Sequence, residues 1–142
     1  MLVGLKNGRF CHIQVGVTDS TDKSYSIDFT NHDSYLHVIV SGDKVTRQIA
    51  LDYWREIIDQ CEASSCSKIL LEHAFEEMIS MPEMLQVIGP VTEMLQGRLL
   101  AFYDRYGNYD IPEAGKKIMR SHDVKMQIFE DLGQAERWLL AN

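Results

Sequence analysis

Three residues with acid–base side chains follow two apolar runs of the chain. Glu72 and His73 end the run that begins at Lys68, and Asp104 ends the run 99–103. A set of carboxylates with a histidine can transfer protons or hold a metal ion. The spacing supplies neither a nucleophile nor a fixed third ligand, so we expect solvated polar groups that satisfy the ends of strands. The sequence therefore predicts no catalytic residue, no metal site and no cofactor.

The stretch after His73 carries a different kind of candidate site. Residues 74–81 are expected to form a loop, yet four of them are large and apolar. Flexible methionines beside an aromatic ring suit an adaptable apolar surface, with two tyrosines near it that could contact a ligand. The candidate ligand- or partner-binding residues are Phe75, Met78, Ile79, Met81, Tyr103 and Tyr106. The alternative is that this loop is buried and packs in the core.

Both candidate sites depend on a strand over residues 68–73. Three consecutive branched aliphatic residues lie at its centre, which is typical of a strand covered on both faces. Long patterned segments precede and follow it, so we place it in the middle of a parallel sheet. Further strands are predicted over residues 98–104 and 124–130. The residues expected to be nearly fully buried in these strands are Leu70, Phe102 and Ile128.

Helical spacing and capping residues predict helices between the strands. One apolar stripe predicts a helix from Thr46 to Cys61, with the Thr46 side chain as its N-cap. Another helix is predicted from Pro112 to about Ser121. Asp131 is positioned to cap a final helix at the C-terminus.

The helix after residue 80 is predicted to be irregular. Ser80 and Glu83 form a capping box at its start. Gly89-Pro90 then interrupts it, because proline lacks a backbone N–H and its ring crowds the preceding turn. We therefore expect a kink or two short helices, near 82–88 and 90–96.

Alternating patterns predict strands nearer the N-terminus. Residues 25–30 and 35–40 alternate and are joined by a short turn, which predicts an antiparallel hairpin. Residues 1–24 are interpreted as an N-terminal extension, with a candidate edge strand over 11–17. Residues 25–142 are predicted to form one α/β domain. It should contain a mostly parallel sheet of four or five strands, an antiparallel edge hairpin and helices on both faces.

Composition excludes several function classes. The chain has 142 residues, the size of a single domain, and a formal net charge of -7. An acidic surface repels phosphate backbones, so we expect no nucleic-acid partner. No apolar run approaches the roughly 20 residues that span a bilayer, and no secretory leader is evident. These features favour a cytoplasmic protein without a membrane span.

The order of these elements and the C-terminal sequence resemble a known family. The ending Phe129-Glu130-Asp131-Leu132-Gly133-Gln134-Ala135-Glu136-Arg137-Trp138-Leu139 is similar to the last strand and helix of STAS domains, in their SpoIIAA-like branch. The resemblance covers residues 25–140. It implies a four- or five-stranded sheet, no enzyme activity and a role in protein interaction. It also implies kinship in fold with CRAL-TRIO lipid carriers, and thus the binding of non-polar ligands.

One family feature does not carry over. In the phosphorylated STAS antagonists an Asp-Ser pair precedes the helix after the central strand. Here that stretch is His73-Ala74-Phe75-Glu76-Glu77-Met78, which has no hydroxyl group. A phosphoserine switch is therefore not expected in this chain.

The sequence leaves three functions open. The first is a non-catalytic STAS-like binding domain that acts through protein–protein interaction or regulation, which could include a homodimer. The alternative is a carrier or sensor of a small non-polar ligand. The third is an uncharacterised enzyme that uses Glu72, His73 and Asp104.

Overall fold

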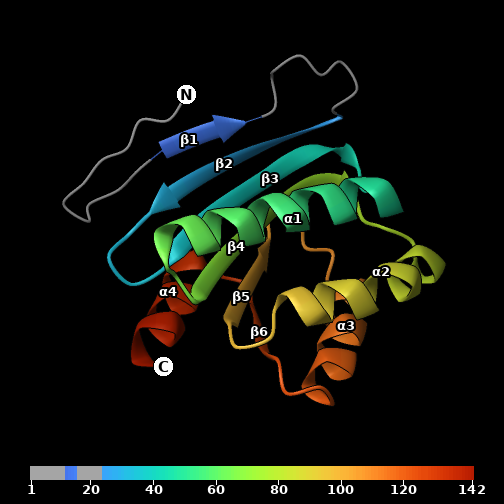
Figure 1. Ribbon diagram of the computed structural model, residues 1–142. Helices are drawn as coiled ribbons and strands as arrows, with labels where there is room; N and C mark the ends of the chain where they lie inside the picture. Colours follow the sequence, from blue (N-terminus) through green and yellow to red (C-terminus); the bar gives the residue numbers. More distant parts are fainter. Residues whose placement is uncertain (1–11, 16–23) are drawn as a thin grey trace.

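The chain folds around one mixed sheet whose strands lie side by side in sequence order. The computed structural model describes the backbone of residues 12–15 and all of residues 24–142. The first two strand pairs are antiparallel and the remaining three are parallel (Figure 1). The strands are β1 (His12–Val15), β2 (Tyr25–Asn31), β3 (Leu36–Lys44), β4 (Lys68–Glu77), β5 (Leu99–Asp104) and β6 (Lys125–Phe129).

The expected α/β class and its antiparallel hairpin are confirmed. The hairpin is the β2–β3 pair, and β3 to β6 form the parallel part of the sheet. β1 lies in the N-terminal segment and pairs with β2 at the edge, which brings the described sheet to six strands. Residues 1–11 and 16–23 of that segment lie outside the described residues, and a domain boundary at residue 24 stays a prediction.

Four helices cover the two faces of the described sheet unequally. The first three pack together over one face, in the larger apolar cluster. The last packs on the opposite face against β4, β5 and β6, in a smaller cluster (Figure 1). Among the described residues, no helix combines the length and apolarity that crossing a bilayer requires. The helices are α1 (Arg47–Ser64), α2 (Met81–Met94), α3 (Asp110–Arg120) and α4 (Leu132–Ala141).

The predicted caps begin three of these helices. The Thr46 hydroxyl accepts from the amide of Ile49 at 3.2 Å at the start of α1. The Ser80 hydroxyl accepts from the amide of Glu83 at 3.3 Å at the start of α2. The Asp131 carboxylate accepts from two amides in the first turn of α4. Each cap satisfies amides that have no partner inside the helix.

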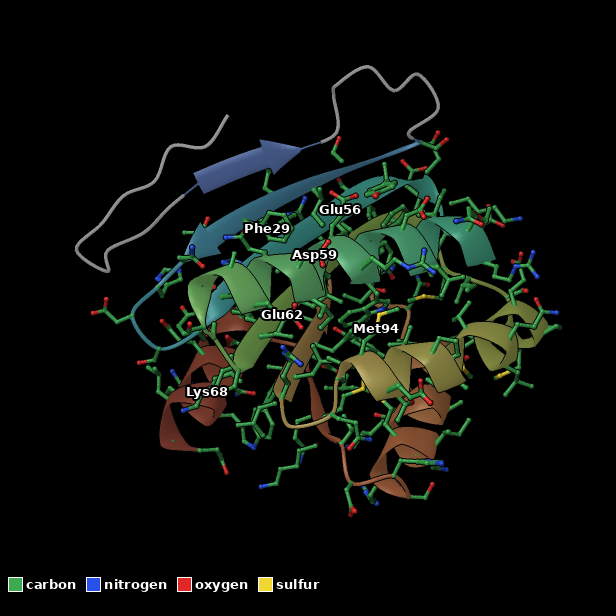
Figure 2. The ribbon with its side chains drawn as sticks, viewed as in Figure 1. Phe29, Glu56, Asp59, Glu62, Lys68 and Met94 are labelled. Atoms are coloured by element: carbon green, nitrogen blue, oxygen red, sulfur yellow. The ribbon has the colours of Figure 1, made fainter. Side chains whose placement is uncertain are left out.

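The outer side of α1 is acidic. Glu56, Asp59 and Glu62 follow one another along this helix (Figure 2). Two of these carboxylates have partners: Glu56 accepts a hydrogen bond from the Tyr25 hydroxyl of β2, and Glu62 lies 3.9 Å from the Arg98 guanidinium. The contact between Tyr25 and Glu56 ties the outer part of the sheet to the helix that covers it.

Two expectations about local structure are wrong. The predicted loop 74–81 begins as strand, because β4 continues to Glu77 and pairs with β3 as far as Lys44. Two separate helices, one of the two alternatives predicted at Gly89-Pro90, are absent, since α2 is one helix with Pro90 inside it. The other alternative, a kink, stays a prediction. Gln86 and Pro90 are exposed, so water can take the hydrogen bond that the proline ring removes.

The strands place alternate residues on opposite faces. Leu70 and Phe102 are buried as expected, but on different faces of the sheet. Ile128 is only half-buried, because β6 is the edge strand of the parallel part. β4 and β5 therefore each contribute side chains to both cores.

A substitution at Leu70 tests the packing of α4 on the sheet. Its side chain is 2% exposed beneath α4. Leu70→Ala should lower the free energy of unfolding by about 2–5 kcal/mol, because it leaves a cavity in the smaller core. Chemical denaturation measures the change. Leu140→Ala on the exposed side of α4 is the matched control, with an expected change within about 0.5 kcal/mol. A loss below roughly 1 kcal/mol for Leu70→Ala would contradict the placement of α4.

Candidate functional site

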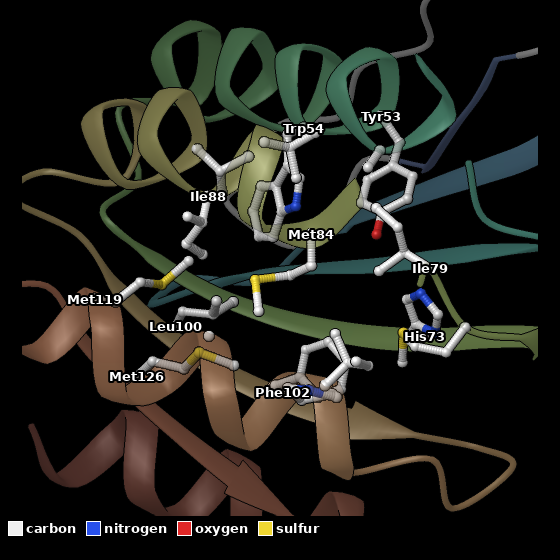
Figure 3. Close-up of a pocket in the computed structure, with 17 residues that line it drawn as sticks. Tyr53, Trp54, His73, Ile79, Met84, Ile88, Leu100, Phe102, Met119 and Met126 are labelled. Atoms are coloured by element: carbon white, nitrogen blue, oxygen red, sulfur yellow. The ribbon is translucent and has the colours of Figure 1, made fainter. Parts of the chain in front are cut away.

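A cavity of about 80 Å³ lies in the larger core, between the sheet and the first three helices (Figure 3). Its walls come from α1, α2, α3, the segment before α2, and strands β4, β5 and β6. Most of its lining side chains are apolar. Four of them are methionines, whose flexible thioethers can move to fit an occupant. These are Met78, Met84, Met119 and Met126.

The His73 imidazole reaches this cavity with both ring nitrogens buried and without hydrogen bonds. His73 is 1% exposed and lies at the carboxyl-terminal part of β4. Its Nδ1 is 3.4 Å from Oδ2 of Asp104, which ends β5 and is 2% exposed. Neither ring nitrogen, nor Oδ2 of Asp104, makes a hydrogen bond. Buried polar atoms are nearly always paired, so this pair is unusual.

The backbone fixes the positions of both members of the pair. Asp104 Oδ1 accepts from the Tyr106 amide at 2.8 Å, which holds the carboxylate in the turn after β5. The Arg105 amide donates to the His73 carbonyl at 2.8 Å and extends the β4–β5 ladder. The Tyr109 hydroxyl donates to the Asp104 carbonyl at 3.2 Å. These hydrogen bonds fix the backbone at His73 and Asp104 and hold the Asp104 carboxylate in place, with Nδ1 and Oδ2 3.4 Å apart.

Aromatic rings surround the His73 imidazole. The centroids of Phe75 and Phe102 lie 4.9 and 5.6 Å from it. The Tyr53 ring is 6.3 Å away, and its hydroxyl points toward the part of the cavity where His73 lies (Figure 3). Burial, and secondarily the Asp104 carboxylate, raises the pKa of Tyr53 above its ordinary value, so the hydroxyl stays protonated. This end of the cavity thus holds two polar groups in apolar walls.

A second polar cluster lies on the opposite face of β4. Glu72 accepts from His37 Nε2 at 3.1 Å and from the Arg105 guanidinium at 2.6 Å. The hydrogen bond from His37, and then that from Arg105, lowers the pKa of Glu72 although burial opposes the shift. The paired Glu72 carboxylate raises the pKa of Arg105 in turn. This cluster is satisfied, in contrast to His73 and Asp104.

The expectation that Glu72, His73 and Asp104 are solvated strand ends is wrong. All three are buried, with Glu72 at 6% exposed. The cause is that β4 continues past His73 and α1 covers this end of the sheet. The three also fail to form one set, because alternation along β4 puts Glu72 on the face opposite His73. In the part of the chain that the structure describes, no group of three potential metal ligands is present.

The predicted binding residues do not form one lip. Met78 and Ile79 line the cavity, but Phe75 is 0% exposed and packs in the core beside Gly42. A Cβ at position 42 would lie 2.8 Å from the Phe75 ring, so the packing needs glycine there. The apolar residues of the segment therefore belong largely to the core because β4 extends through Phe75.

The other three predicted residues are dispersed. Met81 is exposed in the first turn of α2, and Tyr106 is exposed in the turn after β5. Tyr103 is half-buried and pairs in register with Glu72, so it lies on the face away from the cavity. The sequence did not predict the cavity walls from α3 and β6. Apolar residues that line a cavity have the same spacing in the sequence as apolar residues in a filled core.

The Glu72 cluster predicts a specific dependence of stability on pH. A carboxyl group with a lowered folded pKa contributes stability above its unfolded pKa, near 4.3, and loses it as the pH falls through the folded pKa. Glu72→Gln should therefore cost about 1.5–3 kcal/mol at pH 7, and the difference from wild type should shrink toward pH 3. Urea denaturation across this range measures it.

The matched control is Glu77→Gln on the same strand. Glu77 is exposed and its contact with Lys44 is 3.8 Å long, so the change should be well under about 1 kcal/mol at every pH. A Glu72→Gln deficit that stays constant down to pH 3 would contradict the assigned ion pairing.

Comparison with solved structures gives a likeness in fold. No family model matches the chain, and no curated protein sequence matches it. The chain is similar to a solved structure from Shewanella loihica PV-4, an uncharacterised protein of the DUF3478 family with a SpoIIAA-like fold. The two share 14% sequence identity with a TM-score of 0.43, over 96% of this chain and 99% of the other. A likeness of this size transfers no ligand, partner or activity to the chain.

Proposed function

We propose that the chain is a non-catalytic binding domain that holds a small, mainly apolar ligand in the cavity beneath α1, α2 and α3. The observation that carries this proposal is an apolar cavity with a buried histidine in its wall whose ring nitrogens make no hydrogen bond. Sequence analysis favoured a protein partner and kept a carrier or sensor as the alternative. The cavity favours the carrier or sensor, because such a protein needs interior space.

The walls support an occupant of modest size. A ligand that fills a space of about 80 Å³ buries its own apolar surface against these walls. Four methionines in the wall allow the cavity to widen with little strain. A compact ring or short branched chain fits these requirements.

The position of the cavity also supports ligand binding. Asp104 ends β5, and His73 pairs with it in register on β4, four residues before that strand ends. In open α/β sheets, ligands gather beyond the carboxyl ends of parallel strands. The cavity approaches the carboxyl end of β5 at Phe102 and extends to Met119 of α3.

A protein partner remains a second proposal, supported by one surface feature. Met81 and Leu85 are both exposed and lie four residues apart on α2, so they share one side of the helix. Two side chains make a small apolar surface compared with a stable interface. Native mass spectrometry of freshly purified protein reports on both proposals, since it shows a retained small molecule and the stoichiometry together.

Two helical glycines provide a matched test of the cavity. The probe is methylenecyclopentane, a compact hydrocarbon, and NMR titration measures its affinity. Gly115→Ala adds a methyl group to the cavity wall, 3.5 Å from Ile88, so affinity should fall roughly ten-fold or more. Gly89→Ala in α2 meets no atom within 4 Å and should leave affinity unchanged.

Gly115→Ala should also be slightly more stable than wild type, because alanine has a higher helix propensity by about 1 kcal/mol. Gly89→Ala should not share this gain, because a Cβ on the residue before Pro90 crowds the proline ring in a helical backbone. Weaker probe binding by the more stable Gly115→Ala is then an effect on the cavity and not on folding. Failure of wild-type protein to bind the probe, or equal binding by wild type and Gly115→Ala, would refute the proposed cavity site.

The proposal of a non-catalytic role makes its own prediction. Among the described residues that line the cavity, none is a serine, cysteine or lysine, so His73 has no nucleophile to activate there. Broad hydrolase and transferase screens should therefore stay at background. Turnover that disappears in His73→Ala, but persists in the exposed-site control His122→Ala, would show that the domain is an enzyme.

A further inference from the structure

We infer that the cavity selects a small apolar alcohol, whose single hydroxyl group forms hydrogen bonds with both Tyr53 and His73. This inference rests on the proposed function and specifies the chemical class of its ligand. It follows from two polar groups that lie at one end of the cavity and make no hydrogen bond with each other. Their placement, their burial and the apolar walls around them carry the argument.

The Tyr53 hydroxyl is the first of these groups. Tyr53 belongs to α1, is 5% exposed and lines the cavity. No hydrogen bond joins its hydroxyl to another described residue, and none joins it to the imidazole of His73. Burial raises the pKa of Tyr53, so the group keeps its hydrogen and can donate one hydrogen bond and accept another.

The His73 imidazole is the second group. Its Nδ1 lies 3.4 Å from Asp104 Oδ2, and Asp104 is not among the residues that line the cavity. Nε2 is the nitrogen on the other edge of the ring, and it is buried without a hydrogen-bond partner. Figure 3 shows the Tyr53 hydroxyl and a ring nitrogen of His73 directed toward the same part of the cavity, beside Ile79. One small polar group placed there can therefore contact both.

The hydrogen-bonding capacity of the two groups favours a hydroxyl between them. An imidazole nitrogen donates when it carries hydrogen and accepts when it does not. A ligand hydroxyl meets both forms of Nε2, because it donates to a nitrogen without hydrogen and accepts from an N–H. The tyrosine hydroxyl can donate or accept, so it pairs with the same ligand group in the remaining direction. The fit does not depend on which ring nitrogen of His73 carries the hydrogen.

Other polar groups match this end of the cavity less well. A ketone or ether oxygen only accepts, so it leaves Nε2 unpaired whenever that nitrogen carries no hydrogen. An ammonium or carboxylate group would bury a charge among mainly apolar walls, which is strongly disfavoured. A polyol would press further hydroxyl groups against aliphatic, aromatic and thioether side chains, at a cost for each that finds no partner. A single hydroxyl on a compact hydrocarbon avoids these costs.

Tyr53→Phe tests the inference with little disturbance of the fold. It removes one oxygen atom that makes no hydrogen bond to a described residue, so the variant should be about as stable as wild type. NMR titration gives the affinities of cyclopentanol and methylcyclopentane, two probes of nearly equal shape that differ in the hydroxyl. Tyr35→Phe is the matched control, because that hydroxyl belongs to the smaller core and donates to Glu136 at 2.8 Å.

The affinity ratio, alcohol over hydrocarbon, should fall roughly three- to ten-fold from wild type to Tyr53→Phe, since one hydrogen bond in the cavity is lost. Tyr35→Phe should leave the ratio unchanged. Comparing ratios cancels the greater hydration of the alcohol. A ratio that is the same in wild type and Tyr53→Phe overturns the inference and leaves the proposed function standing. Wild-type protein that binds neither probe overturns both.

Nitrogen NMR of the His73 ring tests the second contact in wild-type protein. The Nε2 resonance should shift when cyclopentanol is added and shift much less with methylcyclopentane, whichever form the ring takes. Equal responses to the two probes would overturn the contact with His73.

Cyclopentanone, whose oxygen only accepts, separates a hydroxyl from a carbonyl ligand. It should fall short of cyclopentanol either in the shift of Nε2 or in the loss of affinity in Tyr53→Phe, because it has no hydrogen to donate. A ketone that matches the alcohol in both measurements would overturn the choice of a hydroxyl group.

Discussion

The burial of β4 on both faces is the constraint on which the rest of the structure depends. Its central aliphatic residues divide between the two apolar clusters, with Ile69 and Leu71 in one and Leu70 in the other. Because side chains alternate along a strand, the next two residues, Glu72 and His73, must also face opposite cores. Neither can reach bulk water by turning around. Each face therefore has to accommodate one ionisable side chain from the middle of the sheet.

The two faces meet this demand in different ways. On the α4 face, Glu72 lies beside His37 of β3 and receives the guanidinium of Arg105, whose side chain remains half exposed. That arrangement satisfies the carboxylate without burying a whole ion pair. On the other face, three helices exclude water, and Asp104 approaches His73 without completing a hydrogen bond. The imidazole that lacks hydrogen bonds is also part of the cavity wall.

Much of the fold was predictable from sequence because its signals are local. Consecutive aliphatic residues identified β4, and Thr46, Ser80 and Asp131 each act through amides within three positions along the chain. The extension of β4 through Phe75 was not predictable in this way. It depends on pairing with β3 and on Gly42, which leaves room for the Phe75 ring. The burial of the strand ends at His73 and beyond was missed for the same reason, since it is determined by distant elements that cover them.

The site illustrates why an apolar pattern does not locate a cavity. Met119 and Met126 occupy ordinary core positions in α3 and β6, and nothing in their spacing separates them from residues in a filled core. The space lies between the sheet and the helices above it, with Gly115 of α3 presenting no side chain to the gap. Helices that pack through a glycine and flexible methionines can separate or close by small side-chain movements. His73 is held by the backbone at one end of the cavity, and flexible methionines form much of the remaining wall. Such a site can orient one functional group of a ligand while it tolerates variation in the rest.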